Sequence, residues 1–189
     1  MDEPSPGPPT SATEGPARDR CARDGRRYRI RDLRPDDLDL ELAFVDGLSN
    51  ETRYLRLQYA TTGMSREMAA RLLELDGCNR LAMAAVSDDR GSERIVGVCR
   101  YAREPGAHFA EFAIVVADDW QGTGVGTELM REVCLAARSR GVRRLVGETL
   151  ATNRRFIDWA RSFGYTVDHG PDAEHARVTL DLDGPKAPA

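Results

Sequence analysis

The sequence contains few cysteines, and their spacing argues against two kinds of protein. Four cysteines are spread through 189 residues, no two form a C-x-x-C pair, and none lies beside a histidine. A zinc site or a disulfide framework needs clustered or regularly paired cysteines, so we expect no metal and no disulfides. Free thiols are typical of a reducing compartment, and we expect the protein to be cytoplasmic.

Long apolar runs and an excess of basic residues are also missing. No apolar stretch approaches the roughly 20 residues of a membrane-spanning helix, and the proline-rich start lacks a signal-peptide core. Acidic residues outnumber basic ones by 31 to 27, whereas non-specific binding of nucleic acid needs a basic surface. We therefore expect no membrane and no nucleic acid among the partners.

The chain does contain enough apolar sequence for one packed domain between two tails. Hydrophobic residues make up 41% of the chain and charged residues 31%, as in ordinary globular proteins. Prolines, small polar residues and charges dominate residues 1–25, and little there can be buried, which predicts a disordered tail. A second disordered tail is expected over residues 184–189, which leaves residues 27–183 for the domain.

The most distinctive stretch is a glycine-rich segment over residues 120–127, which reads WQGTGVGT. The apolar, β-branched residues 111–116 predict a buried strand before it, and apolar residues at spacings of three and four predict a helix up to about Arg140. Such a junction directs backbone N–H groups and the positive end of the helix dipole at one point. Glycines let a ligand approach the backbone closely, so the segment suits a phosphate or a pyrophosphate.

Two other phosphate-binding patterns fit this segment poorly. The P-loop ends in Gly-Lys-Ser/Thr, whereas Gly126 and Thr127 are followed by Glu128 and the loop has no lysine. The dinucleotide pattern needs a third glycine at position 127 and a turn directly after its strand, although Glu148 lies at the distance of a ribose-binding acid. A plain glycine-rich turn is the other alternative, but three glycines in five residues would cost conformational entropy that a simple turn avoids.

Hydrophobic periodicity divides the rest of the domain into strands and helices. The expected strands cover residues 28–33, 81–86, 94–101, 111–116, 143–150, 165–167 and 176–182. The expected helices cover residues 35–46, 49–57, 65–76, 125–140 and 156–163. Short turns join the strands between residues 81 and 116, which predicts an antiparallel meander, whereas the strand after the long helix should be parallel to its predecessor.

Several motifs carry a resemblance to a known family. Gln121-x-x-Gly124-x-Gly126 resembles the pyrophosphate loop of the GNAT superfamily of N-acetyltransferases, which binds acetyl-coenzyme A. The order of elements is similar to the GNAT fold over residues 27–183, and Asn153, followed by Phe163-Gly164-Tyr165, looks like the family's last helix. Residues 49–56, 111–113, 119–122 and 147–154 together resemble the acetyltransferase domain of bacterial protein lysine acetyltransferases.

The resemblance implies an α/β fold with a mixed, mostly antiparallel sheet of six or seven strands, flanked by helices and splayed at its central parallel pair. Acetyl-CoA would lie in the splay, with one strand pairing with the pantetheine arm and the loop amides holding the pyrophosphate. Gln121 would brace the loop, and Asn153 would contact the coenzyme near the thioester. The implied cofactor-binding residues are Ile114, Val115, Val116, Gln121, Gly122, Thr123, Gly124, Val125, Gly126, Thr127 and Asn153.

An amine acceptor must lose a proton before it attacks the thioester, and a carboxylate can assist. Lysine has a reference pKa of about 10.4, so little free amine is present at neutral pH without a base. Glu111 is our candidate base because a charge that shares a strand face with Ala113 and Val115 is unusual unless it meets solvent or substrate. Glu148 on the facing strand is the second choice, and a merely solvent-facing Glu111 is the alternative.

The general acid for the departing thiolate is the point at which this sequence departs from the family. Many GNAT enzymes have a tyrosine four residues before the terminal glycine, where Ala160 stands here. Water can protonate the thiolate, because a thiol has a pKa near 8.5, or Tyr165 can do so. The sequence thus predicts transfer of an acetyl group from acetyl-CoA to an amine by direct attack, with a protein lysine as the favoured acceptor. A small-molecule amine acceptor and a non-catalytic acyl-CoA-binding module are the alternatives.

Overall fold

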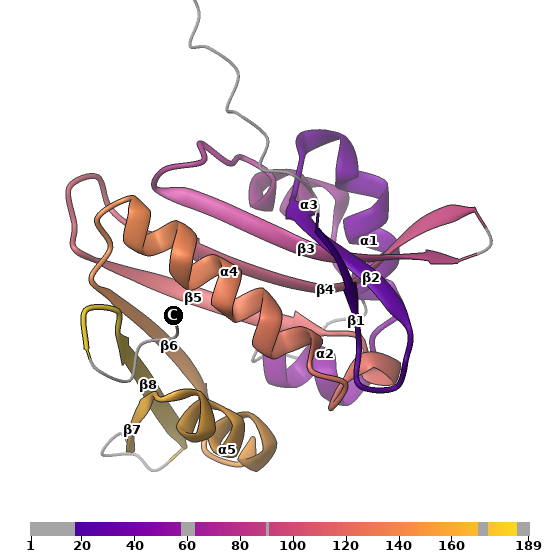
Figure 1. The fold of residues 1–189 in the computed structure, drawn as a ribbon. Helices are drawn as coiled ribbons and strands as arrows, with labels where there is room; N and C mark the ends of the chain where they lie inside the picture. Colours follow the sequence, from indigo (N-terminus) through magenta and orange to yellow (C-terminus); the bar gives the residue numbers. More distant parts are fainter. Residues whose placement is uncertain (1–17, 58–62, 90, 170–173, 185–189) are drawn as a thin grey trace, which may run out of the picture.

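The computed structural model describes residues 18–57, 63–89, 91–169 and 174–184. The expected tails over residues 1–17 and 185–189, and the expected turn at residues 170–172, lie outside this part of the chain. Within it, Figure 1 shows a twisted sheet with helices packed on its faces. Eight strands form one sheet in the order β1-β2-β3-β4-β5-β6-β8-β7.

The strands confirm a mixed, mostly antiparallel sheet with one strand more than the sequence predicts. Only β5 and β6 run parallel among the pairs of the described sheet, and every other neighbouring pair is antiparallel. The strands are β1 (Arg18–Cys21), β2 (Arg27–Asp32), β3 (Arg80–Asp89), β4 (Ser92–Ala102), β5 (Phe109–Val116), β6 (Arg144–Leu150), β7 (Thr166–His169) and β8 (His175–Asp181).

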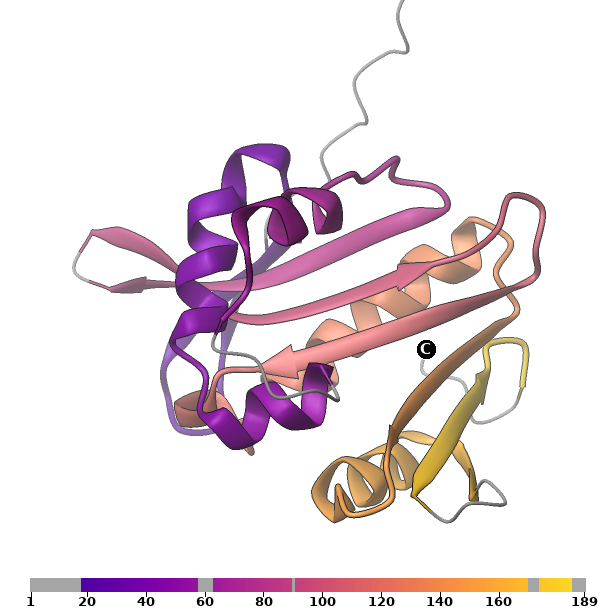
Figure 2. The ribbon, with the colours of Figure 1, turned by 180° about the vertical axis from the view of Figure 1, so that it is seen from behind.

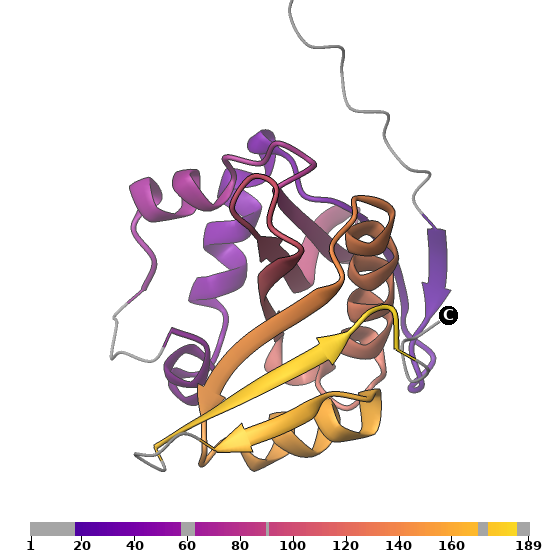
Figure 3. The same ribbon diagram turned by 90° about the vertical axis from the view of Figure 1, so that its left-hand side faces the viewer.

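The helices cover both faces of the sheet. They are η1 (Pro35–Asp37), α1 (Leu38–Asp46), α2 (Asn50–Leu57), α3 (Arg66–Leu72), η2 (Asp118–Trp120), α4 (Val125–Ser139) and α5 (Arg154–Phe163). Helix α4 crosses one face over β3, β4 and β5, and α1 contacts β4 from the opposite face (Figures 1 and 2). Seen from the side, α4 lies on one side of the sheet and α1, α2 and α3 lie on the other (Figure 3).

The core confirms the apolar stripe predicted for the long helix. Helix α4 buries Val125, Leu129 and Val133 along the face that meets the sheet. Cys134 on the same helix and Cys99 on β4 are both buried, as expected for cysteines that pack in a core. The tight packing of this helix fixes the direction of its N-terminus, which lies next to the glycine-rich loop.

Helix α3 is shorter than the pattern predicts, and a tight turn held by Asp76 follows it. The sequence predicts a helix up to Asp76, but α3 ends at Leu72. The Oδ1 atom of Asp76 accepts hydrogen bonds from the backbone N–H groups of Cys78, Asn79 and Arg80, which form a tight turn into β3.

Residues 18–25, which the sequence assigns to a disordered tail, instead form a strand and a turn in the structure. Strand β1 pairs antiparallel with β2, from Arg18 opposite Ile30 to Cys21 opposite Arg27. Ala22 is buried, and Arg20 forms ion pairs with Glu128 and Glu132 of α4. The expected boundary at residue 25 is therefore wrong. Strand β1 is short and highly charged, so hydrophobic periodicity gives no sign of it.

Candidate functional site

The central feature of the site is a cleft that opens where β5 and β6 separate. The two strands pair only from Phe109 opposite Arg144 to Glu111 opposite Val146. Beyond Glu111 they diverge and form the walls of a cavity of about 1290 Å³. The ring of Phe112 fills the apex, where a Cβ on Gly147 would lie 2.7 Å from it, so only glycine fits at position 147.

One wall of the cleft is the open edge of β5. On its other edge β5 pairs with β4, with Val115 opposite Val98 and Ile114 opposite Cys99. Beyond Glu111 the edge that faces the cleft has no strand partner in the described sheet. Ile114, Val115 and Val116 all line the cleft, as expected for the strand that receives an extended ligand. An open strand edge offers backbone donors and acceptors to such a ligand.

The glycine-rich loop closes one end of the cleft and presents unpaired amides. Gly122 and Gly124 have φ angles of +80° and +96°, which favour glycine. The backbone N–H groups of Gly122, Gly124, Val125 and Gly126 donate to no acceptor within the described residues. They surround the positive end of the α4 dipole, which is a favourable place for an anion.

Two of the expected loop residues serve the loop itself rather than the cleft. Thr123 is buried beneath the loop, and both its N–H and its hydroxyl donate to the carbonyl oxygen of Trp120. The N–H of Thr127 donates to the carbonyl oxygen of Gly124, although the side chain of Thr127 lines the cleft. The N–H groups of Thr123 and Thr127 thus donate within the loop, so fewer loop amides are available to a ligand than the sequence suggests.

Gln121 links the loop to three other elements. Its Nε2 donates to the carbonyl oxygen of Val116 at 3.2 Å and lies 3.3 Å from the hydroxyl of Thr52, on α2. Its Oε1 accepts from Nη1 of Arg155, at the start of α5, at 2.7 Å. The side chain therefore holds the end of β5, α2 and α5 around the loop.

Asp118 provides a second link between α2 and the loop. Its carboxylate accepts from the N–H and the hydroxyl of Ser49 and from the hydroxyl of Thr52, at 2.6–2.8 Å. Burial opposes ionisation of this group, but the hydrogen bonds from Thr52 and Ser49 outweigh it and hold the pKa of Asp118 below its usual value. Ser49 also caps α2 by accepting from the N–H of Thr52, as predicted.

The two candidate bases lie on the same face of the sheet. Glu111 pairs with Val146, and Glu148 lies two residues further along β6, so both side chains leave the sheet on one side. Glu148 lines the cleft and accepts from Nη2 of Arg177, on β8, at 2.8 Å. Glu111 is exposed and lies at the last paired position, just beyond the cleft walls. Glu148 and, more weakly, Glu111 raise the pKa of Arg177.

Asn153 lines the cleft and has both of its side-chain groups engaged. Its Oδ1 caps α5 by accepting from the N–H of Phe156 at 3.3 Å, and its Nδ2 donates to the hydroxyl of Thr149 at 3.1 Å. These bonds fix the position of α5 against β6. The residue therefore shapes the cleft in addition to facing it.

Tyr165 does not reach the cleft and is a poor candidate for the general acid. Its hydroxyl lies 3.1 Å from the sulfur of Met130 in the core, and burial raises the pKa of Tyr165 well above its usual value. Ala160 is fully buried on α5. The structure therefore speaks against Tyr165 as the acid for the thiolate.

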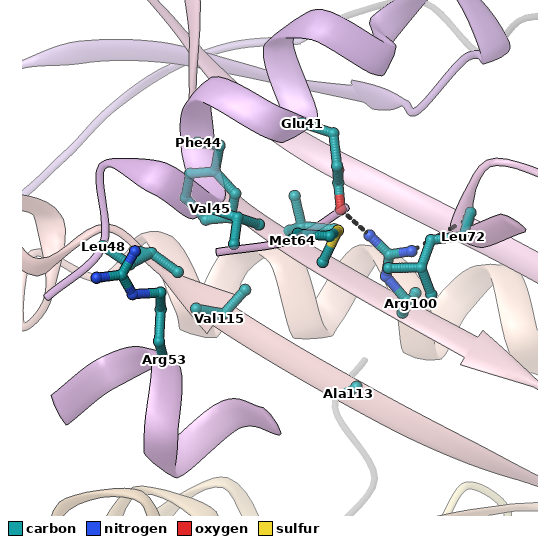
Figure 4. A pocket seen from close by; sticks show the side chains of 11 residues that line it. Glu41, Phe44, Val45, Leu48, Arg53, Met64, Leu72, Arg100, Ala113 and Val115 are labelled. Carbon is teal, nitrogen blue, oxygen red and sulfur yellow. Dashed lines mark hydrogen bonds and ion pairs between the residues drawn. The ribbon is translucent and has the colours of Figure 1, made fainter. Parts of the chain in front are cut away.

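A small cavity of about 20 Å³ lies between α1, α2 and the sheet, on the face opposite α4. Glu41 lines it and accepts a hydrogen bond from Arg100 with one carboxylate oxygen, while its other oxygen has no partner among the described residues (Figure 4). Such a volume holds about one water molecule. Ala113 and Val115 of β5 also line the cavity, so it lies directly behind the wall of the cleft.

Sequence reasoning missed several residues that line the cleft with positive charge. Arg23, Arg154 and Arg155 all lie on its rim. Arg154 and Arg155 directly follow Asn153, which was a usable signal, because the start of a helix beside an anion site is a common place for such residues. Arg23 lies in the segment assigned to the tail, so the sequence offered no reason to place it there.

Comparison with known proteins identifies the family. Residues 50–165 match the model of the Acetyltransferase (GNAT) family. The chain is 33% identical over 149 residues to Acetyltransferase PA5475 of Pseudomonas aeruginosa, covering 79% of this chain and 80% of that protein. The chain therefore belongs to the GNAT acetyltransferase family, which confirms the resemblance stated above. Enzymes of this class are acetyl-CoA-dependent N-acetyltransferases.

Three further proteins are similar to the chain over most of its length. Acetyltransferase Pat of Mycolicibacterium smegmatis is 30% identical over 140 residues, which cover 72% of this chain but 41% of that protein. The crystal structure of the GNAT domain of S. lividans PAT matches with a TM-score of 0.79 at 28% identity, over 87% of this chain and 96% of that domain. A putative acetyltransferase of Salmonella typhimurium, solved with acetyl-CoA, shares the fold with a TM-score of 0.65 at 17% identity.

The residues present fit the coenzyme expected for this class. Unpaired amides and cationic side chains surround the loop, and a Cβ on Gly126 would lie 3.3 Å from Val116, so the loop approaches β5 without side chains between them. No helix in the described ranges is long and apolar enough to cross a membrane. In the same ranges no cluster of His, Cys, Asp and Glu side chains could hold a metal ion.

Proposed function

We propose that this enzyme transfers the acetyl group of acetyl-CoA to a primary amine by direct attack, with a protein lysine side chain as the favoured acceptor. The observation that carries the proposal is the meeting of four unpaired loop amides with the open edge of β5 in one cleft. Together they offer an anion site and an open strand edge in one cleft, which suits a pyrophosphate that carries a long amide-containing arm.

The coenzyme binds through main-chain groups in this proposal. The amides of Gly122, Gly124, Val125 and Gly126 hold the pyrophosphate, and the edge of β5 from Ile114 to Val116 pairs with the pantetheine arm. One N–H group of this edge polarises the thioester oxygen and stabilises the negative charge that develops on it during attack. Gln121 and Asn153 keep the loop and α5 at the positions that the arm requires.

Glu111 is the proposed general base. It has no ion-pair partner among the described residues, whereas the carboxylate of Glu148 is already engaged with the guanidinium of Arg177. Glu111 accepts a proton from the acceptor ammonium, directly or through water. The free amine then attacks the thioester carbon, the nitrogen gives up a second proton to water, the C–S bond breaks, and water protonates the departing thiolate. Glu148 remains the second candidate.

The acceptor is proposed to be cationic and to approach from the face that carries the two glutamates. Glu111, Glu148 and Asp168 all raise the pKa of Arg177, so three carboxylates act on this part of the face, and such a group of acidic side chains attracts a lysine ammonium. The motifs that resemble bacterial protein lysine acetyltransferases support a protein substrate. A small-molecule amine would meet the same face.

Release of free thiol from acetyl-CoA tests the proposal when it is measured against a panel of lysine-containing proteins, lysine peptides and small amines. The proposal expects release with a protein or peptide acceptor and less with small amines. Release with small amines alone would contradict the lysine assignment. CoA binding without release for any acceptor would instead support a non-catalytic acyl-CoA-binding module.

A further inference from the structure

A cationic side chain from outside the family-matched residues lies directly on the glycine loop. Arg23 belongs to the turn between β1 and β2, and its N–H donates to the carbonyl oxygen of Thr123 at 2.9 Å. A Cβ built on Gly124 would lie 3.6 Å from Nε and 3.7 Å from Cγ of Arg23. The arginine side chain therefore runs across the Cα of this glycine and lines the cleft.

The turn that carries Arg23 is fixed against the loop on both sides. Arg20 forms an ion pair with Glu128 in the first turn of α4. The guanidinium of Arg26 lies 3.8 Å from the ring centre of Trp120, the first residue of the glycine-rich segment. Because its backbone is held in place, Arg23 loses less conformational entropy when it binds a ligand.

The two arginines nearest the loop glycines differ in their partners. Arg155 lies beside Gly122, where a Cβ would meet its Nη2 at 3.3 Å, and its Nη1 is engaged with Gln121. The guanidinium of Arg23 has no hydrogen-bond or ion-pair partner among the described residues. An unpaired guanidinium beside an anion-binding loop is available to the ligand itself.

The chemistry of coenzyme A leaves one charged group for such a residue. The loop amides account for the pyrophosphate, but the 3′-phosphate on the ribose is a separate phosphomonoester at the outer end of the coenzyme. The side chain of Arg23 lies beside Gly124, where three of its atoms are within 4 Å of a Cβ built on that glycine, so its guanidinium lies close to the amide cluster. A planar guanidinium with several donors suits a terminal phosphate.

We propose that Arg23 binds the 3′-phosphate of acetyl-CoA and makes the enzyme select CoA over 3′-dephospho-CoA. The inference rests on the proposed function, because it assumes that the pyrophosphate lies on the loop amides. It also assigns a role to the N-terminal hairpin, which lies outside the family-matched residues 50–165.

Isothermal titration with CoA and with 3′-dephospho-CoA tests this assignment on the full chain. Arg23→Gln is expected to weaken CoA binding about tenfold and to leave the affinity for 3′-dephospho-CoA nearly unchanged. The matched control is Arg27→Gln on the same hairpin, whose side chain is 84% exposed and faces Asp19. This control should leave both affinities unchanged, and thermal unfolding should show that both variants fold.

Three results would overturn the assignment in different ways. Equal weakening for both ligands would place Arg23 on the pyrophosphate, and unchanged affinity for both would remove it from the site. In either case the proposed function stands, because the wild-type chain still binds CoA. If the wild-type chain binds neither ligand, the proposed function fails together with the role of Arg23.

Discussion

The coenzyme side and the acceptor side of the cleft are built differently. On the coenzyme side, α2, α5 and the β1–β2 turn are all bonded to the glycine loop, through Thr52, Arg155 and the backbone of Arg23. On the acceptor side, Glu111 is exposed and Glu148 belongs to a surface ion pair with more than half of each side chain exposed. Exposed ion pairs contribute little to stability.

This difference indicates which ligand the fold specifies. Many hydrogen bonds from three elements hold the loop in the one shape that a constant ligand, the coenzyme, requires. The acceptor side has few fixed groups and an open approach, which suits a lysine presented by a much larger surface. We therefore expect substitutions on the coenzyme side to change binding and those on the acceptor side to change turnover.

Glu111→Gln is expected to have the largest effect, because it should lower turnover and leave CoA binding unchanged. Loss of the base should lower turnover at neutral pH about 100-fold or more, because general base catalysis typically contributes that much. The loss should shrink at high pH, where more of the acceptor amine is already free. CoA affinity, measured by titration, should not change. The control is Glu104→Gln on the exposed turn before β5, and an unchanged pH–rate profile for Glu111→Gln would remove this residue from the mechanism.

Glu41→Gln tests whether the buried ion pair between Glu41 and Arg100, next to β5, stabilises the fold. Glu41 is 2% exposed and is paired with Arg100, so its loss leaves a largely buried guanidinium without a counter-charge. The expected cost in the free energy of unfolding is about 3 kcal/mol. Denaturant unfolding measures it against Glu67→Gln, which breaks an exposed pair with Arg71 and should cost about 0.5 kcal/mol or less. Equal effects would show that the Glu41 pair is not structural.

Gly124→Ala should weaken CoA binding about tenfold, because a left-handed φ of +96° strains an alanine and displaces the loop amides. Gly141→Ala is a matched control: its φ is +78°, nothing lies within 4 Å of its added Cβ, and it lies at the far end of α4. Both variants should lose about 1 kcal/mol of stability from backbone strain. If both lost CoA affinity equally, the effect would come from general destabilisation.

Arg177→Gln has the smallest expected effect. Removal of this cation makes the face that carries Glu111 and Glu148 more negative, so a cationic acceptor should bind there slightly more tightly. The KM for a lysine peptide should fall by less than about threefold, because the groups are exposed. CoA affinity serves as the control and should not change. A higher KM for the lysine peptide would contradict the approach of a cationic acceptor over this face.

Much of the fold could be predicted from the sequence because its elements have strong periodic signals. The stripe on α4, the meander of β3 to β5 and the caps at Ser49, Asn153 and Gly164 were all visible in the order of residues. Strand β1 was not visible, because a charged four-residue strand has no hydrophobic pattern and is stabilised by contacts with α4 that lie more than 100 positions away.

The candidate site was predictable where a local motif defines it and not where distant segments meet. Gln121, Gly122, Gly124 and Gly126 could be identified from their spacing. The internal use of the Thr123 amide, by contrast, depends on the turn at Trp120. The pairing of Glu148 with Arg177 depends on the register between β6 and β8, and a single sequence carries no signal for such pairings.

The binding of the pyrophosphate by the loop amides is tested most directly by a two-dimensional ¹⁵N–¹H NMR titration with CoA. We predict that the largest shifts occur at the amides of Gly122, Gly124, Val125 and Gly126, whose N–H groups lack partners within the described structure. The amide of Thr123, which already has an acceptor, should shift less. Largest shifts outside the loop, or no shifts at saturating CoA, would contradict the claim that these amides bind the pyrophosphate.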